Sequence, residues 1–352
     1  MRILELNFEK HWRGGERQTI YGIQGFVKAG NEVTLICRSA CPLEAKANAL
    51  GLNVFSFRKM TGVLIFLLSK AKQYDILHCQ TSNMLTWCLI TKWRHKKPVV
   101  LSRRVSYKPK GLFTLLKYRS TTKVIAISNA VKNILEDQGV PHVIVIGDVA
   151  VPAELNKERA LAFINRYAVS NKKIIGTMAA FESEKDPITM VAAIGKLYAT
   201  RKDFVFFHFG DGSLIEDIRA AVLASGLQHV YYTPGFIQEV TDLFSVIDVF
   251  AFSSIDEGSG SSILDAFLYK VPVASTNGGG LQDLISADRG LVCNVRDADQ
   301  LAVNINLLLD NNSLVQSFVN TAYTYVTEIH NLDVITRQYI EVFTPMLPAS
   351  DR

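Results

Sequence analysis

The stretch FAFSSIDEGSGSSILDAFLYKVPVASTNGGGLQD, from Phe250 to Asp283, contains two apolar runs, a helical pattern between them and a glycine turn. It begins inside a short apolar run over residues 247–252, which is typical of a buried parallel strand. A small loop then leads into a predicted helix over 261–269, and a second apolar run over 271–275 ends before three glycines. Strand, helix and strand in this order predict a βαβ unit in a parallel sheet.

The loop before the predicted helix has the composition of a phosphate site. Small residues at a helix start leave backbone N–H groups exposed at the positive end of the helix dipole, where anions bind. The residues that we expect to offer these groups are Gly258, Ser259, Gly260, Ser261 and Ser262.

Two acidic residues flank this loop. Glu257 precedes it, and Asp265 lies in the helix, off an apolar stripe. A carboxylate beside a diphosphate is electrostatically costly unless it binds another group, and sugar hydroxyls are suitable donors to it. The pattern therefore favours a ligand that carries both phosphate and sugar. A structural βαβ unit with a surface acid is the alternative.

These motifs resemble those of the retaining glycosyltransferases of family 4, also called group 1, which have the GT-B fold. Glu257 and Asp265 enclose seven residues, and the motifs Pro272-Val273-Ala274-Ser275 and Gly279-Gly280-Leu281-Gln282-Asp283 follow. Both later acids are Asp where the family more often has Glu. The resemblance implies an α/β protein with two Rossmann-like domains whose parallel sheets face a central cleft.

The length and composition fit two globular domains. The chain has 352 residues, of which 48% are hydrophobic, enough for two cores. We expect an acceptor-side domain over 1–150, a donor-binding domain over 151–330, and a helix over 331–352 that crosses back to the first domain. Five cysteines without a metal-ligand pattern predict reduced thiols in the cytoplasm. Residues 1–6 read as a strand, and the longest apolar run, 62–68, is too short to span a bilayer.

The first half of the chain offers weaker motifs. The resemblance places Gly14 and Gly15, after the first strand, opposite the donor diphosphate. His78 ends a later strand, where it either faces a ligand or is a satisfied structural histidine. Arg103 and Arg104 end the next strand, and two guanidiniums could bind phosphate or an acidic acceptor, the alternative being a solvated basic loop.

Further donor contacts are implied by the resemblance in the second half. Lys185 stands where the family has a diphosphate-binding lysine, but Ala180 stands where it has an arginine, so Arg103 or Arg104 is a candidate substitute. Gly210 belongs to a Gly-Asp-Gly turn. Gly235 and Phe236 follow a strand where relatives seat the nucleotide base.

Charge is one-sided in the first half. No acidic residue lies between Asp75 and Glu136, whereas twelve basic residues do. Within this region, residues 107–119 interleave lysines and arginines with Leu112, Phe113, Leu115 and Leu116. Such a segment could lie on an anionic membrane, although a helix packed on its own domain would look similar.

The function that these observations predict is transfer of a sugar from a nucleotide diphosphate sugar to a hydroxyl of a bacterial surface glycan or lipid-linked acceptor of lipopolysaccharide or capsule type. The resemblance implies retention of configuration. Because the sequence has no convincing metal site, we expect neither a metal nor a cofactor, and a UDP-sugar is the expected donor. The basic first half favours a phosphorylated or acidic acceptor at the inner face of the cytoplasmic membrane, and we expect no nucleic-acid partner. A nucleotide-sugar epimerase of the same fold and a non-catalytic nucleotide-sugar-binding partner of a heteromeric transferase stay as alternatives.

Overall fold

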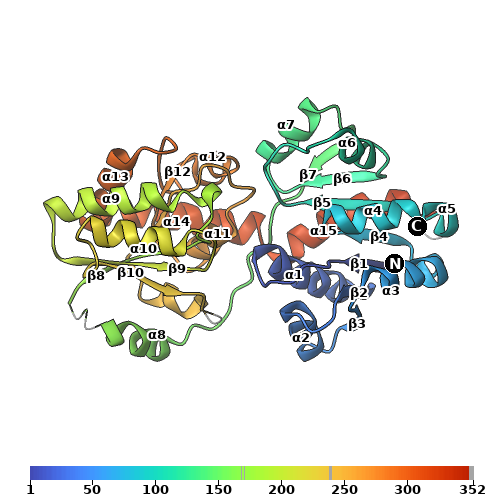
Figure 1. The fold of residues 1–352 in the computed structure, drawn as a ribbon, viewed down its shortest axis with the longest axis horizontal. Helices are drawn as coiled ribbons and strands as arrows, with labels where there is room; N and C mark the ends of the chain where they lie inside the picture. Colours follow the sequence, from blue (N-terminus) through green and yellow to red (C-terminus); the bar gives the residue numbers. More distant parts are fainter. Residues whose placement is uncertain (168, 170, 238–239, 349–352) are drawn as a thin grey trace. The chain divides into compact units, whose positions relative to one another are not determined.

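The computed structural model describes residues 1–167, 169, 171–237 and 240–348. The chain divides into two compact units. Unit 1 contains Met1–Val151 and Ile329–Arg352, and unit 2 contains Pro152–Glu328 (Figure 1). Unit 1 is thus built from two separate parts of the chain.

Unit 1 has a seven-stranded parallel sheet in the order β3-β2-β1-β4-β5-β6-β7. Its strands are β1 (Arg2–Leu6), β2 (Glu32–Arg38), β3 (Asn53–Phe57), β4 (Ile76–Cys79), β5 (Val99–Arg103), β6 (Lys123–Ala126) and β7 (Val143–Val145). Its helices are α1 (Gly14–Lys28), α2 (Pro42–Ala49), α3 (Met60–Lys70), α4 (Ser82–Ile90), α5 (Lys92–His95), α6 (Leu112–Arg119), α7 (Asn129–Asp137) and α15 (Leu332–Phe343).

Both faces of this sheet are buried, because successive side chains of a strand point to opposite faces. Ile3 packs with α1, α2 and α15, whereas its neighbour Leu4 packs with α3, α4 and α7. From α15, Tyr339 and Phe343 enter the first of these cores. The last helix of the chain is therefore part of the hydrophobic core of unit 1.

Unit 2 has a six-stranded parallel sheet in the order β10-β9-β8-β11-β12-β13. Its strands are β8 (Lys173–Met178), β9 (Phe204–Phe209), β10 (Tyr231–Gly235), β11 (Val249–Phe252), β12 (Val273–Thr276) and β13 (Leu291–Cys293). Its helices are α8 (Lys157–Ile164), α9 (Pro187–Thr200), α10 (Ile215–Ala224), α11 (Ser261–Leu268), α12 (Leu281–Ile285), α13 (Ala298–Asp310) and α14 (Asn312–Ile329). This strand order is that of the Rossmann fold, so the predicted α/β class with parallel sheets is confirmed.

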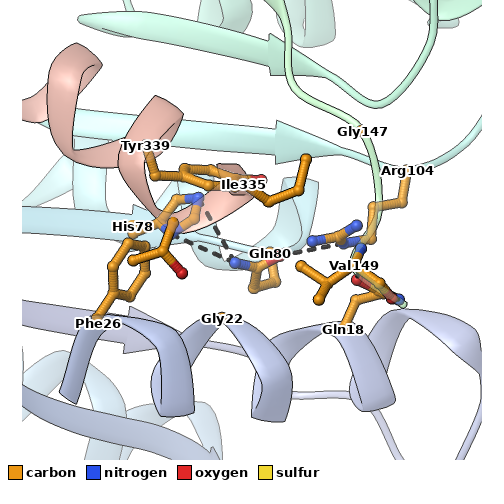
Figure 2. A pocket seen from close by; sticks show the side chains of 11 residues that line it. Gln18, Gly22, Phe26, His78, Gln80, Arg104, Gly147, Val149, Ile335 and Tyr339 are labelled. Atoms are coloured by element: carbon orange, nitrogen blue, oxygen red, sulfur yellow. Dashed lines mark hydrogen bonds between the residues drawn. The ribbon is translucent and has the colours of Figure 1, made fainter. Parts of the chain in front are cut away.

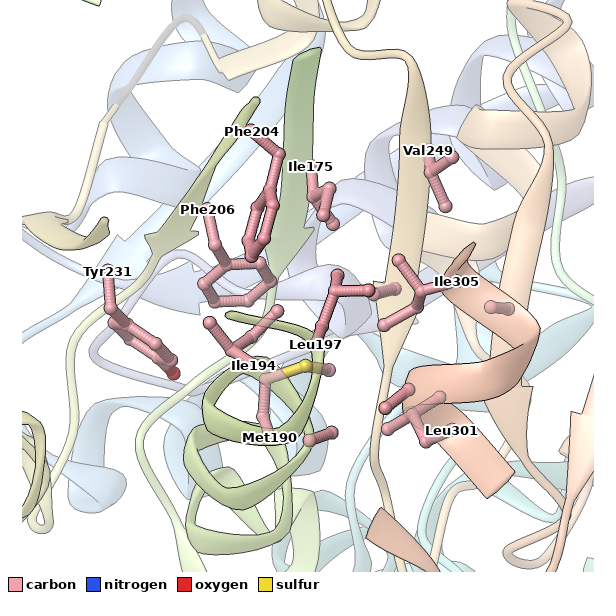
Figure 3. Close-up of a cluster of buried hydrophobic side chains, with 14 of the residues drawn as sticks. Ile175, Met190, Ile194, Leu197, Phe204, Phe206, Tyr231, Val249, Leu301 and Ile305 are labelled. Carbon is pink, nitrogen blue, oxygen red and sulfur yellow. The ribbon is translucent and has the colours of Figure 1, made fainter. Parts of the chain in front are cut away.

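One face of the unit 2 sheet is covered by α9, α10 and α13 (Figure 3). Phe204 and Phe206 extend from β9 toward Ile194 and Leu197 of α9. Leu301 of α13 is fully buried in the same cluster. This packed layer holds the strands whose carboxyl ends carry the candidate site.

No helix in the described part of the chain is long and apolar enough to cross a bilayer.

Candidate functional site

The strand order of unit 2 changes direction between β8 and β11, and open α/β sheets bind ligands at such a switch point, beyond the carboxyl ends of the strands. The loops after β8 and β11 are tied together at this point. Ser253 Oγ donates to the carbonyl oxygen of Lys185 at 3.0 Å, and Ser254 Oγ donates to that of Glu184 at 2.8 Å. The two loops therefore have a fixed relative position, as a binding site requires.

At this junction Lys185 Nζ forms an ion pair with the Glu257 carboxylate. The two side chains are 21% and 13% exposed, so the pair is sheltered but open to solvent. Lys185 Nζ also lies 5.7 Å from the centre of the Phe252 ring. Two residues that the sequence assigned to one ligand, 72 positions apart, are thus in direct contact.

The glycine turn after β12 contacts the backbone of Glu257. Gly280 N donates to the Glu257 carbonyl oxygen at 2.8 Å. Gly279 has a φ of +58°, and a Cβ there would lie 2.3 Å from the same oxygen. Only glycine fits both the backbone conformation and the space.

The predicted phosphate-binding residues surround the start of α11. Gly260 is the N-cap residue in a left-handed conformation, and the helix runs from Ser261. Gly258, Ser259 and Ser262 lie in the loop and the first turn. Asp265 lies off the apolar stripe of α11 and is nevertheless only 7% exposed, because residues on several sides of this helix are buried.

The Gly-Asp-Gly turn lies beside the loop after β8. Gly210 N donates to the carbonyl oxygen of Gly235 at 3.0 Å, which joins the ends of β9 and β10. A Cβ on Gly210 would lie 1.9 Å from the carbonyl oxygen of Ala179, so this close approach requires glycine. Phe236, just beyond β10, is 58% exposed.

A buried histidine, His208, lies near the carboxyl end of β9. His208 stacks on Phe181 with the ring centres 3.9 Å apart, and its Nδ1 lies 2.9 Å from Tyr231 Oη. Burial lowers the pKa of His208 to about 3, because a charged imidazole would be desolvated there. This ring is therefore neutral at physiological pH.

In unit 1, His78 is fully bonded inside the protein. It is 1% exposed, its Nδ1 lies 2.5 Å from Glu5 Oε1, and its Nε2 lies 2.8 Å from Ser102 Oγ. Ser102 Oγ lies 3.1 Å from Tyr339 Oη of α15. Of the two alternatives for His78, this geometry matches the structural one.

The same network continues to Arg104 (Figure 2). Gln80 Nε2 donates to Glu5 Oε2 at 3.0 Å. Arg104 Nε donates to Gln80 Oε1 at 3.3 Å. Arg104 also forms an ion pair with Asp148, whose side chain is 5% exposed. His78, Gln80 and Arg104 line a small pocket, together with Gln18, Gly22 and Tyr339.

Arg103 is turned away from this pocket. Its guanidinium is buried, donates to Tyr118 Oη at 2.7 Å and to the Tyr107 carbonyl oxygen, and lies over both tyrosine rings. Arg103 is therefore not in a solvated loop, because its guanidinium is bonded to Tyr118 and Tyr107 within unit 1. Both arginines that the sequence offered as substitutes at Ala180 are already paired within unit 1.

The glycine pair of unit 1 lies in the first turn of α1 rather than in a loop before it, since α1 begins at Gly14. A Cβ on Gly15 would lie 3.7 Å from Arg104 Cδ, so the pair is next to the arginine network. The roles of Asp148, which pairs with Arg104, and Gln18, which lines the pocket, were not predicted from the sequence, because neither residue lies in a motif. Glu5 gave a usable signal, because a lone acid within an apolar strand needs a buried partner.

Among the described residues, no group of three or more His, Cys, Asp or Glu side chains is placed to hold a metal ion.

Both halves of the chain match glycosyltransferase family models. Residues 158–325 match the family described as Glycosyl transferases group 1, and residues 12–147 match the one described as Glycosyltransferase Family 4. Two units with Rossmann-type sheets are the architecture of GT-B proteins. The chain belongs to the glycosyltransferases of family 4, group 1.

Three curated relatives carry substrate names. A 2-deoxystreptamine glucosyltransferase of Streptomyces kanamyceticus is 30% identical over 140 residues, 39% of this chain and 35% of the relative. A 2-deoxystreptamine N-acetyl-D-glucosaminyltransferase of Niallia circulans is 24% identical over 281 residues, 72% of each chain. The lipopolysaccharide core biosynthesis glycosyltransferase LpsE of Rhizobium meliloti is 22% identical over 48% of this chain and 49% of the relative. The chain spans about a third and about half of the length of the first and third of these relatives.

Two solved structures share the fold along almost the whole chain. HepE of Anabaena, solved in complex with UDP and glucose, has a TM-score of 0.85 at 16% identity, covering 98% of this chain and 100% of that one. A glycosyltransferase from Rickettsia africae has a TM-score of 0.83 at 22% identity, covering 98% of each.

Proposed function

We propose that this chain transfers a sugar from a nucleotide diphosphate sugar to an acceptor hydroxyl, with retention of configuration. The observation that carries the proposal is the Lys185–Glu257 ion pair at the switch point of unit 2, beside the start of α11. A cation, a helix N-terminus and a carboxylate suit a ligand that is anionic at one end and rich in hydroxyls at the other.

The roles follow from the chemistry of each group. The diphosphate takes Lys185 and the backbone N–H groups of residues 259–262 as its counter-charges, and Glu257 then accepts hydrogen bonds from sugar hydroxyls. The leaving phosphate takes the proton of the acceptor hydroxyl, so no enzyme nucleophile is needed. Catalysis rests on positioning and on stabilising the departing charge. Lys185 and the backbone N–H groups supply this stabilisation without a metal.

We further propose a UDP-sugar donor and a phosphorylated or acidic acceptor of a bacterial surface glycan, handled in the cytoplasm at the inner face of the membrane. HepE of Anabaena was solved with UDP, and LpsE is named for lipopolysaccharide core biosynthesis. The region between Asp75 and Glu136 is entirely basic in its charged residues, which favours an anionic partner.

Thermal unfolding with UDP, GDP, ADP or CMP, each with magnesium or with chelator, tests the donor site. A ligand at a hundred times its dissociation constant stabilises the folded state by about 2.7 kcal/mol. We expect UDP to stabilise the wild type with or without magnesium, and Lys185→Ala to lose the effect. NMR of the anomeric proton of the product then reports retention or inversion.

A non-catalytic nucleotide-sugar-binding partner is the second candidate. It is favoured by Ala180, which removes one phosphate counter-charge, and by the internal pairing of Arg103 and Arg104. This candidate predicts binding of UDP without turnover of a UDP-sugar in the presence of any glycan acceptor.

A further inference from the structure

Helix α6 of unit 1 has more apolar surface than its packing uses. Its inner side carries Tyr118, which is 3% exposed, and Leu115, which packs against the core of unit 1. Its other apolar residues point outward: Leu112 is 67% exposed, Phe113 is 85% exposed and Leu116 is 46% exposed. Packing of α6 on its own unit therefore accounts for the inner residues and leaves the outer ones unexplained.

The cations of this segment also separate into two groups. Lys117 Nζ donates to Ser82 Oγ and Thr86 Oγ1, and burial lowers its pKa. Arg119 donates to the carbonyl oxygens of residues 138 and 139. These two cations hold α6 in place. In contrast, Lys108 and Lys110, in the loop before α6, are exposed.

The neighbouring helices α4 and α5 carry exposed apolar residues as well. Lys117 bonds to Ser82 at the start of α4, and Lys92 Nζ at the start of α5 lies 3.5 Å from the carbonyl oxygen of Ser120, so both helices are tied to α6. On these helices Ile90 is 55% exposed and Trp93 is 71% exposed. Arg94 and Lys96 are exposed beside them.

We call the exposed apolar residues of this region, together with the exposed cations beside them, the docking surface: Ile90, Trp93, Tyr107, Leu112, Phe113 and Leu116, with Arg94, Lys96, Lys108 and Lys110. We infer that the docking surface binds an anionic lipid bilayer. The inference deepens the membrane location in the proposed function, but it does not depend on the donor site of unit 2.

Charge complementarity selects this partner. The docking surface lies wholly within the region from Asp75 to Glu136, which has no acidic residue between its ends, so nothing in that stretch repels anionic headgroups. Large apolar side chains next to lysines and arginines are the composition of helices that lie in a membrane interface, with aromatic rings at the acyl boundary and cations at the headgroups.

Vesicle flotation with the full chain tests the inference. We expect binding to phosphatidylcholine vesicles that contain phosphatidylglycerol, weakening as salt is raised, and little binding to phosphatidylcholine alone. Leu112→Ser with Phe113→Ser should reduce binding at least about tenfold, since each side chain loses its burial in the bilayer. Lys108→Gln with Lys110→Gln should reduce it roughly tenfold or more at low salt.

Leu223→Ser is the matched control, because Leu223 is a 65% exposed leucine on α10 of unit 2. Its binding should equal that of the wild type. The inference would be overturned if the wild type does not bind anionic vesicles or binds both vesicle types equally. It would also be overturned if the Leu112/Phe113 variant binds as well as the wild type. The inference would also fail if sedimentation shows a dimeric wild type and a monomeric Leu112/Phe113 variant, since a second copy of the chain would then cover the docking surface. UDP-induced thermal stabilisation of the same samples reports separately on the donor site.

Discussion

Lys185 Nζ and the Glu257 carboxylate, on loops that follow different strands of one sheet, form an ion pair beside the start of α11. Each side chain supplies the counter-charge of the other before a ligand arrives. A diphosphate would take Lys185 into its own coordination and release the carboxylate for hydroxyls. The pair thus keeps two binding groups in place at little electrostatic cost.

Removal of either partner should abolish transfer without unfolding the protein. Lys185→Ala and Glu257→Gln should each lower kcat by about a hundredfold or more, the usual effect of losing one stabilising group at a reacting centre. Steady-state kinetics with UDP-sugar donors measures this, and circular dichroism checks folding. Full activity in either variant would refute the assigned site.

Gly279→Ala should damage the site through its backbone. The new Cβ would meet the Glu257 carbonyl oxygen and shift the carboxylate, and a displacement of about 1 Å can lower kcat/KM roughly a hundredfold. Gly226→Ala is the control: its φ is +67°, but nothing lies within 4 Å of the position that its Cβ would take. Both variants should lose about 1–2 kcal/mol of stability from the left-handed conformation, Gly279→Ala should lose more because its Cβ also meets the Glu257 backbone, and only Gly279→Ala should lose activity. Equal activities would show that the turn does not support Glu257.

Arg104→Ala should strongly destabilise unit 1. It removes the guanidinium that pairs with the buried Asp148 carboxylate, and loss of one partner of a buried ion pair typically costs about 3–5 kcal/mol. Urea unfolding measures the loss. Arg104→Lys keeps the charge and should recover part of the stability, whereas equal loss in both variants would indicate that the shape of the guanidinium matters more than its charge.

Acid should destabilise unit 2 through His208. Its pKa falls from 6.5 to about 3 on folding, so the unfolded state binds the proton first as pH decreases. Above pH 6.5 the ring is neutral in both states, so the free energy of unfolding does not depend on its protonation. As pH falls from 6.5 toward 3, the free energy of unfolding decreases by about 1.4 kcal/mol per pH unit. Between about pH 7 and about pH 5, the wild type should lose roughly 2 kcal/mol more than His208→Gln in urea unfolding. Parallel pH profiles would contradict this explanation.

The fold class was predictable from the sequence because it depends on local periodicity. Short apolar runs alternate with amphipathic helices, and the β-rich runs are strands of parallel sheets in the structure, whereas the longest apolar run, 62–68, lies in α3. The family was equally accessible, since the spacing from Glu257 to Asp265 and the glycine turn at 278–280 lie within one continuous stretch.

The side-chain partners in unit 1 were not predictable in the same way. Arg104 pairs with Asp148, 44 positions away, and no local pattern links the two. Lys117 looked like a surface cation, yet it bonds to Ser82 and Thr86 of α4. Sequence periodicity gives the face of a helix, but which of two apolar faces is covered depends on the neighbouring helix, as the outward Phe113 of α6 illustrates.

The place of α15 in unit 1 has a consequence for synthesis of the protein. Ile335, Tyr339 and Phe343 are buried in a core that residues from β1 and α1 also build, but they follow all of unit 2 in the chain. Chains emerge from the ribosome N-terminal end first. Most of unit 2 therefore emerges before α15, and unit 1, although its strands emerge earlier, keeps an uncovered apolar face until α15 has emerged.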